Sequence, residues 1–67
     1  MAKPQLLASA GTLDDVGALI ARFYGGSTKT LIKQSPGQWS IAHARGDFIA
    51  GVRVILRKGR YRFESFA

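Results

Sequence analysis

The chain has 67 residues, with ten Lys or Arg against four Asp or Glu, and its net charge is +6. A chain this short forms one small domain over residues 1–67, and its 46% hydrophobic content is too high for a disordered protein. The lack of cysteine excludes disulfides, thiol chemistry and Cys-type zinc sites, so we expect a cytoplasmic protein. No apolar run approaches the roughly 20 residues that span a bilayer, so we expect no membrane contact.

The first ten residues leave two alternatives open. Leu6 and Leu7 either tuck against the core or add to a sheet edge, and we expect the tip of residues 1–10 to be mobile.

The first strong pattern predicts a helix over residues 13–24. Thr12 can cap its first turn, Asp14 and Asp15 suit the positive end of the helix dipole, and two glycines follow as a stop signal. Gly17 weakens the helix by about 1 kcal/mol relative to Ala, which is tolerable where the sheet packs closely. Its apolar residues step by three or four and form one stripe to be buried. They are Leu13, Val16, Leu19, Ile20 and Phe23.

After this helix the apolar period changes from 3.6 to two, which predicts strands. Three turn signals, Pro36-Gly37, Gly46-Asp47 and Lys58-Gly59, divide the remaining chain into four antiparallel strands. The expected strands are residues 29–34, 39–44, 48–57 and 60–66.

Treating each turn as a two-residue hairpin loop fixes which residues face one another. Because the side-chain period is two, a one-residue slip at any turn would scramble the agreement between the strands. The turn at Pro36-Gly37 is the weakest, since Pro prefers ordinary type II turns. We predict an α+β domain in which the helix packs on the apolar face of a four-stranded antiparallel meander. That face consists of Ile32, Trp39, Ile41, Val52, Val54, Leu56, Tyr61 and Phe63.

The same register gives the opposite, outer face an unusual composition. It combines several Arg and Lys with a single acidic residue, Glu64, around a shallow floor of Ala42, Ala44 and Gly51. An antiparallel sheet in water normally shows a polar outer face. The mixture of basic and apolar residues therefore favours a contact surface.

Basic residues concentrate in the last hairpin, where Arg57 faces Arg60. Such a like-charge pair costs stability, and an anionic partner would relieve it. Guanidinium groups bind phosphates and carboxylates well. We expect Lys29 and Arg45 at the margins of this surface. The candidate nucleic-acid or partner-binding residues are Lys33, Arg53, Arg57, Lys58, Arg60 and Arg62.

These features predict a small, basic, non-enzymatic DNA-binding or other nucleic-acid-binding module, which contacts phosphate through the outer face of its C-terminal hairpin. One alternative is a protein-binding inhibitor or adaptor of the phage or plasmid type, docked on an acidic protein surface. Another is a homodimer in which a second copy covers the small-residue floor. Phosphate binding should weaken steeply with salt, whereas a well-packed protein interface should depend on salt less.

We expect no catalytic residues, no metal site and no cofactor. His43 is the sole histidine and has no companion ligands in the pattern. The segment 25–30 resembles a phosphate loop in composition, but it follows a helix and enters a strand, which reverses the P-loop order. Trp39 and Tyr61 could stack on bases. The register assigns both to the core face, so we expect phosphate contacts rather than base stacking.

Overall fold

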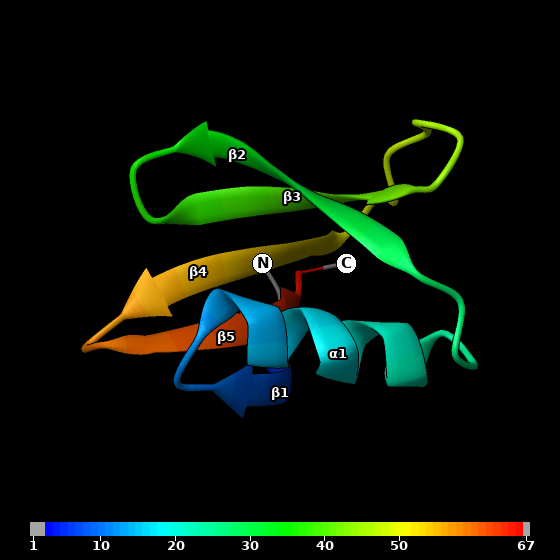
Figure 1. Ribbon diagram of the computed structural model, residues 1–67. Coiled ribbons are helices and arrows are strands. Elements are labelled where there is room, and N and C mark those ends of the chain that lie inside the picture. Colours follow the sequence, from blue (N-terminus) through cyan, green and yellow to red (C-terminus); the bar gives the residue numbers. More distant parts are fainter. Residues whose placement is uncertain (1–2, 67) are drawn as a thin grey trace.

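The computed structural model describes residues 3–66, and within that range the chain forms one helix and a five-stranded sheet (Figure 1). The sheet order is β1-β5-β4-β3-β2, and all neighbouring strands are antiparallel. The predicted α+β class with one helix and an antiparallel sheet is confirmed; residues 1, 2 and 67 of the predicted domain lie outside the described residues. The elements are β1 (Gln5–Ala10), α1 (Leu13–Phe23), β2 (Lys29–Ser35), β3 (Gln38–His43), β4 (Val52–Arg57) and β5 (Arg60–Ser65).

The prediction of four strands is wrong, because β1 adds a fifth. β1 pairs with β5, and Ala10 lies opposite Tyr61. The strand carries a bulge at Leu7, between Leu6 and Ala8. Leu7, Ala8 and Ala10 pack on the core. Both alternatives for this segment therefore apply, since β1 extends the sheet edge and also covers the core.

The ends of α1 follow from local hydrogen bonding. Thr12 Oγ1 accepts a hydrogen bond from the Asp15 N–H at 3.1 Å, which satisfies an otherwise unpaired amide of the first turn. At the other end, Gly25 and Gly26 have φ values of 72° and 88°, and Gly26 N–H donates to Ala21 O at 2.7 Å. Such left-handed backbone favours glycine. The helix accordingly ends one residue before its predicted limit.

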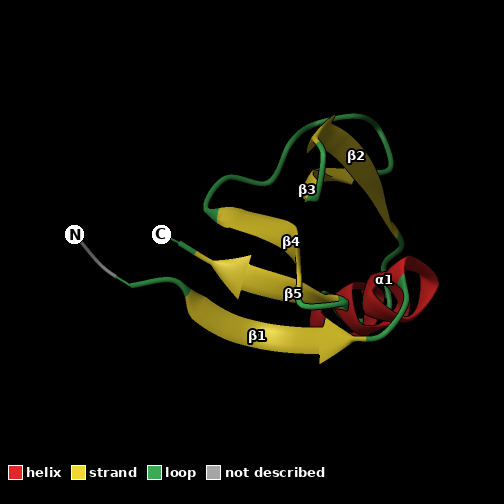
Figure 2. Cartoon of the chain, turned by 90° about the vertical axis from the view of Figure 1, so that its left-hand side faces the viewer, coloured by secondary structure: helices red, strands yellow, loops and turns green. Residues whose placement is uncertain are grey.

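The core lies between α1 and the face of the sheet that curves around it (Figure 2). α1 lies near β1, β5 and β2, whereas in the described chain none of its Cα atoms comes within 8 Å of β3 or β4. Where the helix does not reach, the Trp39 and Tyr61 rings meet edge-to-face across β4, with centroids 5.4 Å apart. The completely buried large side chains are Val16, Ile20, Ile41, Val54 and Phe63.

The β4–β5 hairpin has the predicted register along its whole length. Lys58 and Gly59 form the turn, with φ values of 53° and 77°. Positive φ at both central residues gives the twist that tight hairpins need. The alternation of side chains then places five charged residues on the outer face: Arg53, Arg57, Arg60, Arg62 and Glu64.

The predicted register of β2 is wrong by one residue. Gln34 is an extra residue that bulges between paired positions, so the face of every residue before it is reversed. Leu31 rather than Ile32 packs on the core. Lys33 pairs with Trp39 and therefore lies on the helix side of the sheet, not on the outer face.

The predicted two-residue turn between β3 and β4 is also wrong. Trp39 pairs with Val54 as expected, but the connection is a longer loop over residues 44–51. An isolated bridge joins Ala42 to Phe48. Ala42 has no exposed surface, so the predicted open floor of the outer face is wrong at this residue.

The limits of the other strands lie within one residue of the predictions, whereas the strand expected over 48–57 begins at Val52. Leu56, assigned to the core face, is 40% exposed because it lies at the turn end of β4, beyond the reach of α1. Within residues 3–66, no helix has both the length and the apolar character needed to cross a membrane.

Candidate anion-binding site

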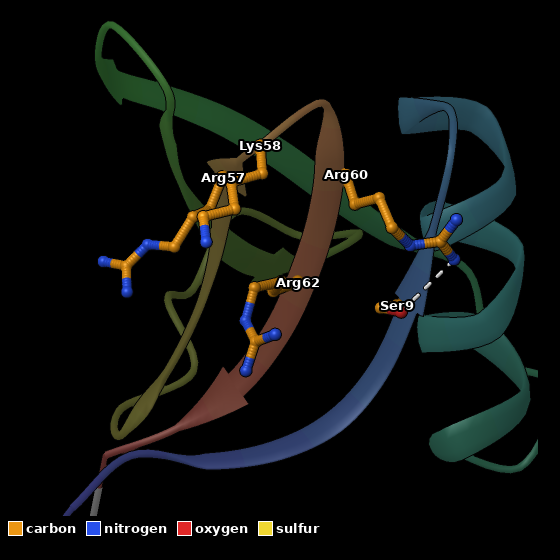
Figure 3. A pocket seen from close by; sticks show the side chains of 5 residues that line it. All are labelled: Ser9, Arg57, Lys58, Arg60 and Arg62. Carbon is orange, nitrogen blue, oxygen red and sulfur yellow. Dashed lines mark hydrogen bonds between the residues drawn. The ribbon is translucent and has the colours of Figure 1, made fainter.

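The outer face of the β4–β5 hairpin holds an open concavity of about 340 Å³ beside its turn (Figure 3). Four of the five residues that line it are cationic and none is acidic. Clustered charge of one sign raises the local potential above that of the same charge spread over the domain. The concavity is therefore suited to an anion. We call this hollow the basic concavity. The residues that line it are Ser9, Arg57, Lys58, Arg60 and Arg62.

Strand pairing brings these side chains together. Arg57 and Arg60 face each other beside the turn, and Arg62 follows on the same face, about 6.8 Å farther along β5. Ser9 comes from β1, where it pairs with Arg62. Figure 3 shows Arg60 directed toward Ser9 on β1 and Arg57 extending in the opposite direction, away from β1, with Arg62 between them.

Ser9 is the residue of the concavity that sequence reasoning missed. Its hydroxyl oxygen accepts a hydrogen bond from Arg60 Nη2 at 3.4 Å. The contact holds the guanidinium over β1 and leaves its other N–H groups without a protein partner among residues 3–66. Ser9 reaches the concavity because β1 pairs with β5, at the far end of the chain, and local turn patterns do not reveal that pairing.

A buried carboxylate organises the other half of the same face. Glu64 is 6% exposed. One of its oxygens accepts a hydrogen bond from Arg62 Nε at 2.9 Å, and the other accepts from Arg53 Nε and Nη2 at 3.4 and 3.3 Å. The Arg53 guanidinium also lies 5.2 Å from the centre of the Phe66 ring. Arg53 is therefore engaged within the protein, whereas Arg62 contacts both Glu64 and the concavity.

Glu64 is held in its charged form. Burial raises the pKa of this carboxyl group, but the hydrogen bonds from Arg62 and Arg53, together with their positive charges, outweigh burial and lower the pKa below its usual value. At neutral pH the carboxylate fixes the Nε side of Arg62. The Nη groups of Arg62 have no protein partner within the described chain.

The structure brings most of the predicted site residues together, but not all. Arg57, Lys58, Arg60 and Arg62 line the concavity, while Arg53 lies on the same face in contact with Glu64. Lys33 lies on the opposite face, because the bulge in β2 reverses its direction. Its predicted place beside the arginines is wrong.

Lys29 and Arg45, which were expected at the margins of the surface, each make a separate contact. The Lys29 ammonium lies 5.1 Å from the centre of the Tyr24 ring, at the C-terminal end of α1. Arg45 forms an ion pair with Asp47 at 2.6 Å in the loop after β3. Neither residue lines the basic concavity.

His43 is half-buried at the end of β3, where its backbone N–H donates to Asp47 O at 2.8 Å. Across residues 3–66, no three His, Asp or Glu side chains lie close enough to hold a metal ion.

Comparisons with protein-family models, curated protein sequences and solved structures give no match. The geometry and charge of the basic concavity are therefore the basis for assigning a function.

Proposed function

We propose that this protein is a small, non-enzymatic binding module that contacts nucleic-acid phosphates through its basic concavity. The observation that carries the proposal is the grouping of four cationic side chains around one concavity with no carboxylate in its lining. Among residues 3–66, the lining holds no carboxylate or imidazole that could act as an acid or base beside the Ser9 hydroxyl, which favours binding over catalysis.

The charges near the turn are not neutralised by the protein itself. Within residues 3–66, no carboxylate lies within salt-bridge distance of Arg57, Lys58 or Arg60. Arg57 and Arg60 are cross-strand neighbours, and like charges in that position destabilise a sheet. A phosphate between them would offset the repulsion, because guanidinium groups bind phosphate oxygens in pairs of hydrogen bonds.

The shape and spacing of the site favour a polymeric anion. A small-molecule pocket typically buries most of its ligand, whereas this concavity lies open on the face of a sheet. Its cations are spread across two strands and a turn, with cross-strand neighbours about 5 Å apart and alternate residues about 6.8 Å apart. A chain of regularly spaced phosphates can contact several of them at once, which is the usual source of affinity for nucleic acid.

The test is the salt dependence of nucleic-acid binding in a double variant, Arg57→Gln with Arg60→Gln. Each lost phosphate contact should flatten the slope of log affinity against log salt by about 0.9 for duplex DNA or about 0.7 for a single strand. The double variant should therefore bind every sequence more weakly and show a flatter slope in fluorescence anisotropy titrations.

A matched control removes the same charge elsewhere. Arg22 lies exposed on α1 and Arg45 lies exposed in the loop after β3, so Arg22→Gln with Arg45→Gln lowers the net charge equally. This control variant should keep most of the wild-type slope of log affinity against log salt. An equal loss of affinity and an equally flattened slope in both double variants would mean that net charge alone, and not the concavity, drives binding. That result would overturn the proposal.

One observation favours a second candidate, an adaptor or inhibitor that docks on an acidic protein surface. Leu6 and Phe66 are 45% and 47% exposed, and Phe66 contacts Arg53 on the outer face. Exposed aromatic and aliphatic side chains next to arginine are common in protein interfaces. Unchanged affinity of the Arg57 and Arg60 double variant for all nucleic acids, with loss of a protein captured from native extract, would favour this candidate.

A further inference from the structure

A part-exposed aromatic pair lies on the helix side of the sheet, near the same turn as the basic concavity. The Trp39 and Tyr61 rings pack edge-to-face at 5.4 Å and an interplanar angle of 63°. Both residues are half-buried, whereas Val54 on the strand between them is completely buried. No Cα atom of α1 comes within 8 Å of β3 or β4, and Figure 1 shows the turn ends of these strands clear of the helix. Part of each residue therefore reaches solvent.

Positive charge continues from the concavity toward this pair. Lys58 occupies the turn itself, between the two faces of the sheet. Lys33 is exposed and pairs with Trp39 on the helix side. Tyr61 lies between Arg60 and Arg62 in β5, so its side chain lies on the helix side of the sheet while those of the two arginines lie on the outer face. The cations of the concavity and the two rings therefore lie on opposite faces of the sheet, near the same hairpin turn.

We infer that the ligand is single-stranded nucleic acid, with phosphates in the basic concavity and a base stacked on the Trp39–Tyr61 pair after the strand passes around the β4–β5 turn. This inference rests on the proposed function and adds the ligand class to it. Every base has a π-face, and stacking on an aromatic side chain contributes to affinity whatever the sequence. A duplex keeps its bases stacked inside and is too stiff to bend around a hairpin turn.

The sequence assigns this pair to the core face, and both residues do pack against the core. The rings do cover Val54, where α1 is absent. Side chains that only cover the core need no charge beside them, yet Lys33 pairs with Trp39 on the same face. The combination of part-exposed aromatic rings and cations is typical of surfaces that bind single strands.

The experiment uses the intrinsic fluorescence of Trp39, which is the sole tryptophan of the chain. The protein is titrated with an oligothymidine, with an abasic strand of the same length and phosphate number, and with the corresponding duplex. The oligothymidine should quench Trp39 and bind about tenfold more tightly than the abasic strand, the gain expected for one stacked base. The duplex should leave the fluorescence unchanged.

Variants of Tyr61 separate stacking from folding. Tyr61→Leu keeps an apolar side chain but removes one of the two π-faces, so it should lower the affinity ratio of the oligothymidine to the abasic strand. Tyr61→Phe should keep the wild-type ratio, and thermal unfolding of both variants checks that they are folded. The ratio compares two ligands on one protein, so a modest loss of stability does not alter it.

The outcomes of this experiment distinguish the two proposals. Equal affinity for the oligothymidine and the abasic strand, with unchanged Trp39 fluorescence, would overturn the stacking inference and leave the phosphate-binding proposal intact. Tighter binding of the duplex would also overturn the inference. Failure of all three ligands to bind would overturn both.

Discussion

The outer face of the β4–β5 hairpin has two halves that share a residue type but differ in what their arginines contact. In the half away from the turn, Arg53 and Arg62 both donate to the buried carboxylate of Glu64. In the half beside the turn, Arg57 and Arg60 face each other and no carboxylate of residues 3–66 reaches them. The position of Glu64 thus separates Arg53, which is engaged within the protein, from Arg57 and Arg60 in the concavity, while Arg62 belongs to both groups.

The difference follows from strand geometry. Glu64 is directly opposite Arg53 and two residues from Arg62 on the same strand, so both guanidinium groups reach it on one face. The turn residues lie beyond its reach. Their side chains are exposed, and water and salt screen their mutual repulsion.

The largest loss of stability in this hairpin should come from removing the Glu64 carboxylate. Glu64→Ala leaves Arg53 and Arg62 without their shared acceptor, and hydrogen bonds to charged groups contribute about 1.5–3 kcal/mol. We expect the free energy of unfolding in urea to fall by about 2 kcal/mol. Arg57→Gln, in the half beside the turn, should change it by no more than about 0.5 kcal/mol. Similar losses in both variants would contradict the distinction between the two halves.

A pH titration should sharpen the same comparison. Because the pKa of Glu64 is lower in the folded protein than its usual value of about 4.3, its contribution to stability is complete above that value. The contribution is lost as the pH falls through the lower, folded-state pKa.

The measurement compares wild type with Glu64→Gln by urea unfolding from pH 7 downward. The stability difference between them should stay constant to about pH 5 and shrink below the usual glutamate pKa. The other acidic residues are common to both proteins, so their titration cancels. A difference that stays the same at pH 3 would show that Glu64 acts through packing and not through its charge.

A smaller stability effect than that of Glu64→Ala should come from adding a carboxylate to the half beside the turn. Ser9 pairs with Arg62 and accepts from Arg60, so Ser9→Glu places an anion within the basic concavity. An opposite-charge cross-strand pair stabilises a sheet by about 0.2–1 kcal/mol. We therefore expect a slight rise in the free energy of unfolding together with weaker binding to nucleic acid. Ser9→Gln is the uncharged control, and a Glu variant that binds like this control would argue against phosphate contacts here.

Much of the fold could be predicted because its signals are local. The capping residue Thr12 and the following glycines define α1 without knowledge of the rest of the chain. The β4–β5 register was predictable because the turn at Lys58-Gly59 has two residues and adopts the backbone that tight hairpins require. The arginines of that hairpin consequently fall on one face, as expected.

The errors arise where pairing depends on an extra residue or on a distant partner. The bulge at Gln34 reverses the faces of Leu31 and Ile32, and both are equally apolar, so composition could not detect the shift. β1 pairs with the last strand of the chain, and no turn signal links the two. The sequence offered a sheet edge as one of two alternatives for Leu6 and Leu7, but no local pattern identified β5 as the partner strand.

The candidate site likewise has a part that local signals could predict and a part that depends on distant pairing. Arg57, Lys58, Arg60 and Arg62 could be grouped from the hairpin alone, whereas Ser9 required the position of β1. Lys33 was misplaced by the bulge in β2. The exposure of the Trp39 and Tyr61 pair could not be predicted because it depends on how far α1 extends across the sheet.

The two bulges also govern what the open edges of this sheet can do. β1 and β2 are the edge strands, and each carries one extra residue, Leu7 and Gln34 respectively. A bulge breaks the regular ladder and increases the local twist, so the strand becomes a poor template for another strand. β2 adds Lys29 and Lys33, whose charge opposes stacking of identical edges. Both features oppose edge-to-edge aggregation, which leaves the two faces of the sheet as the surfaces open to the proposed ligand.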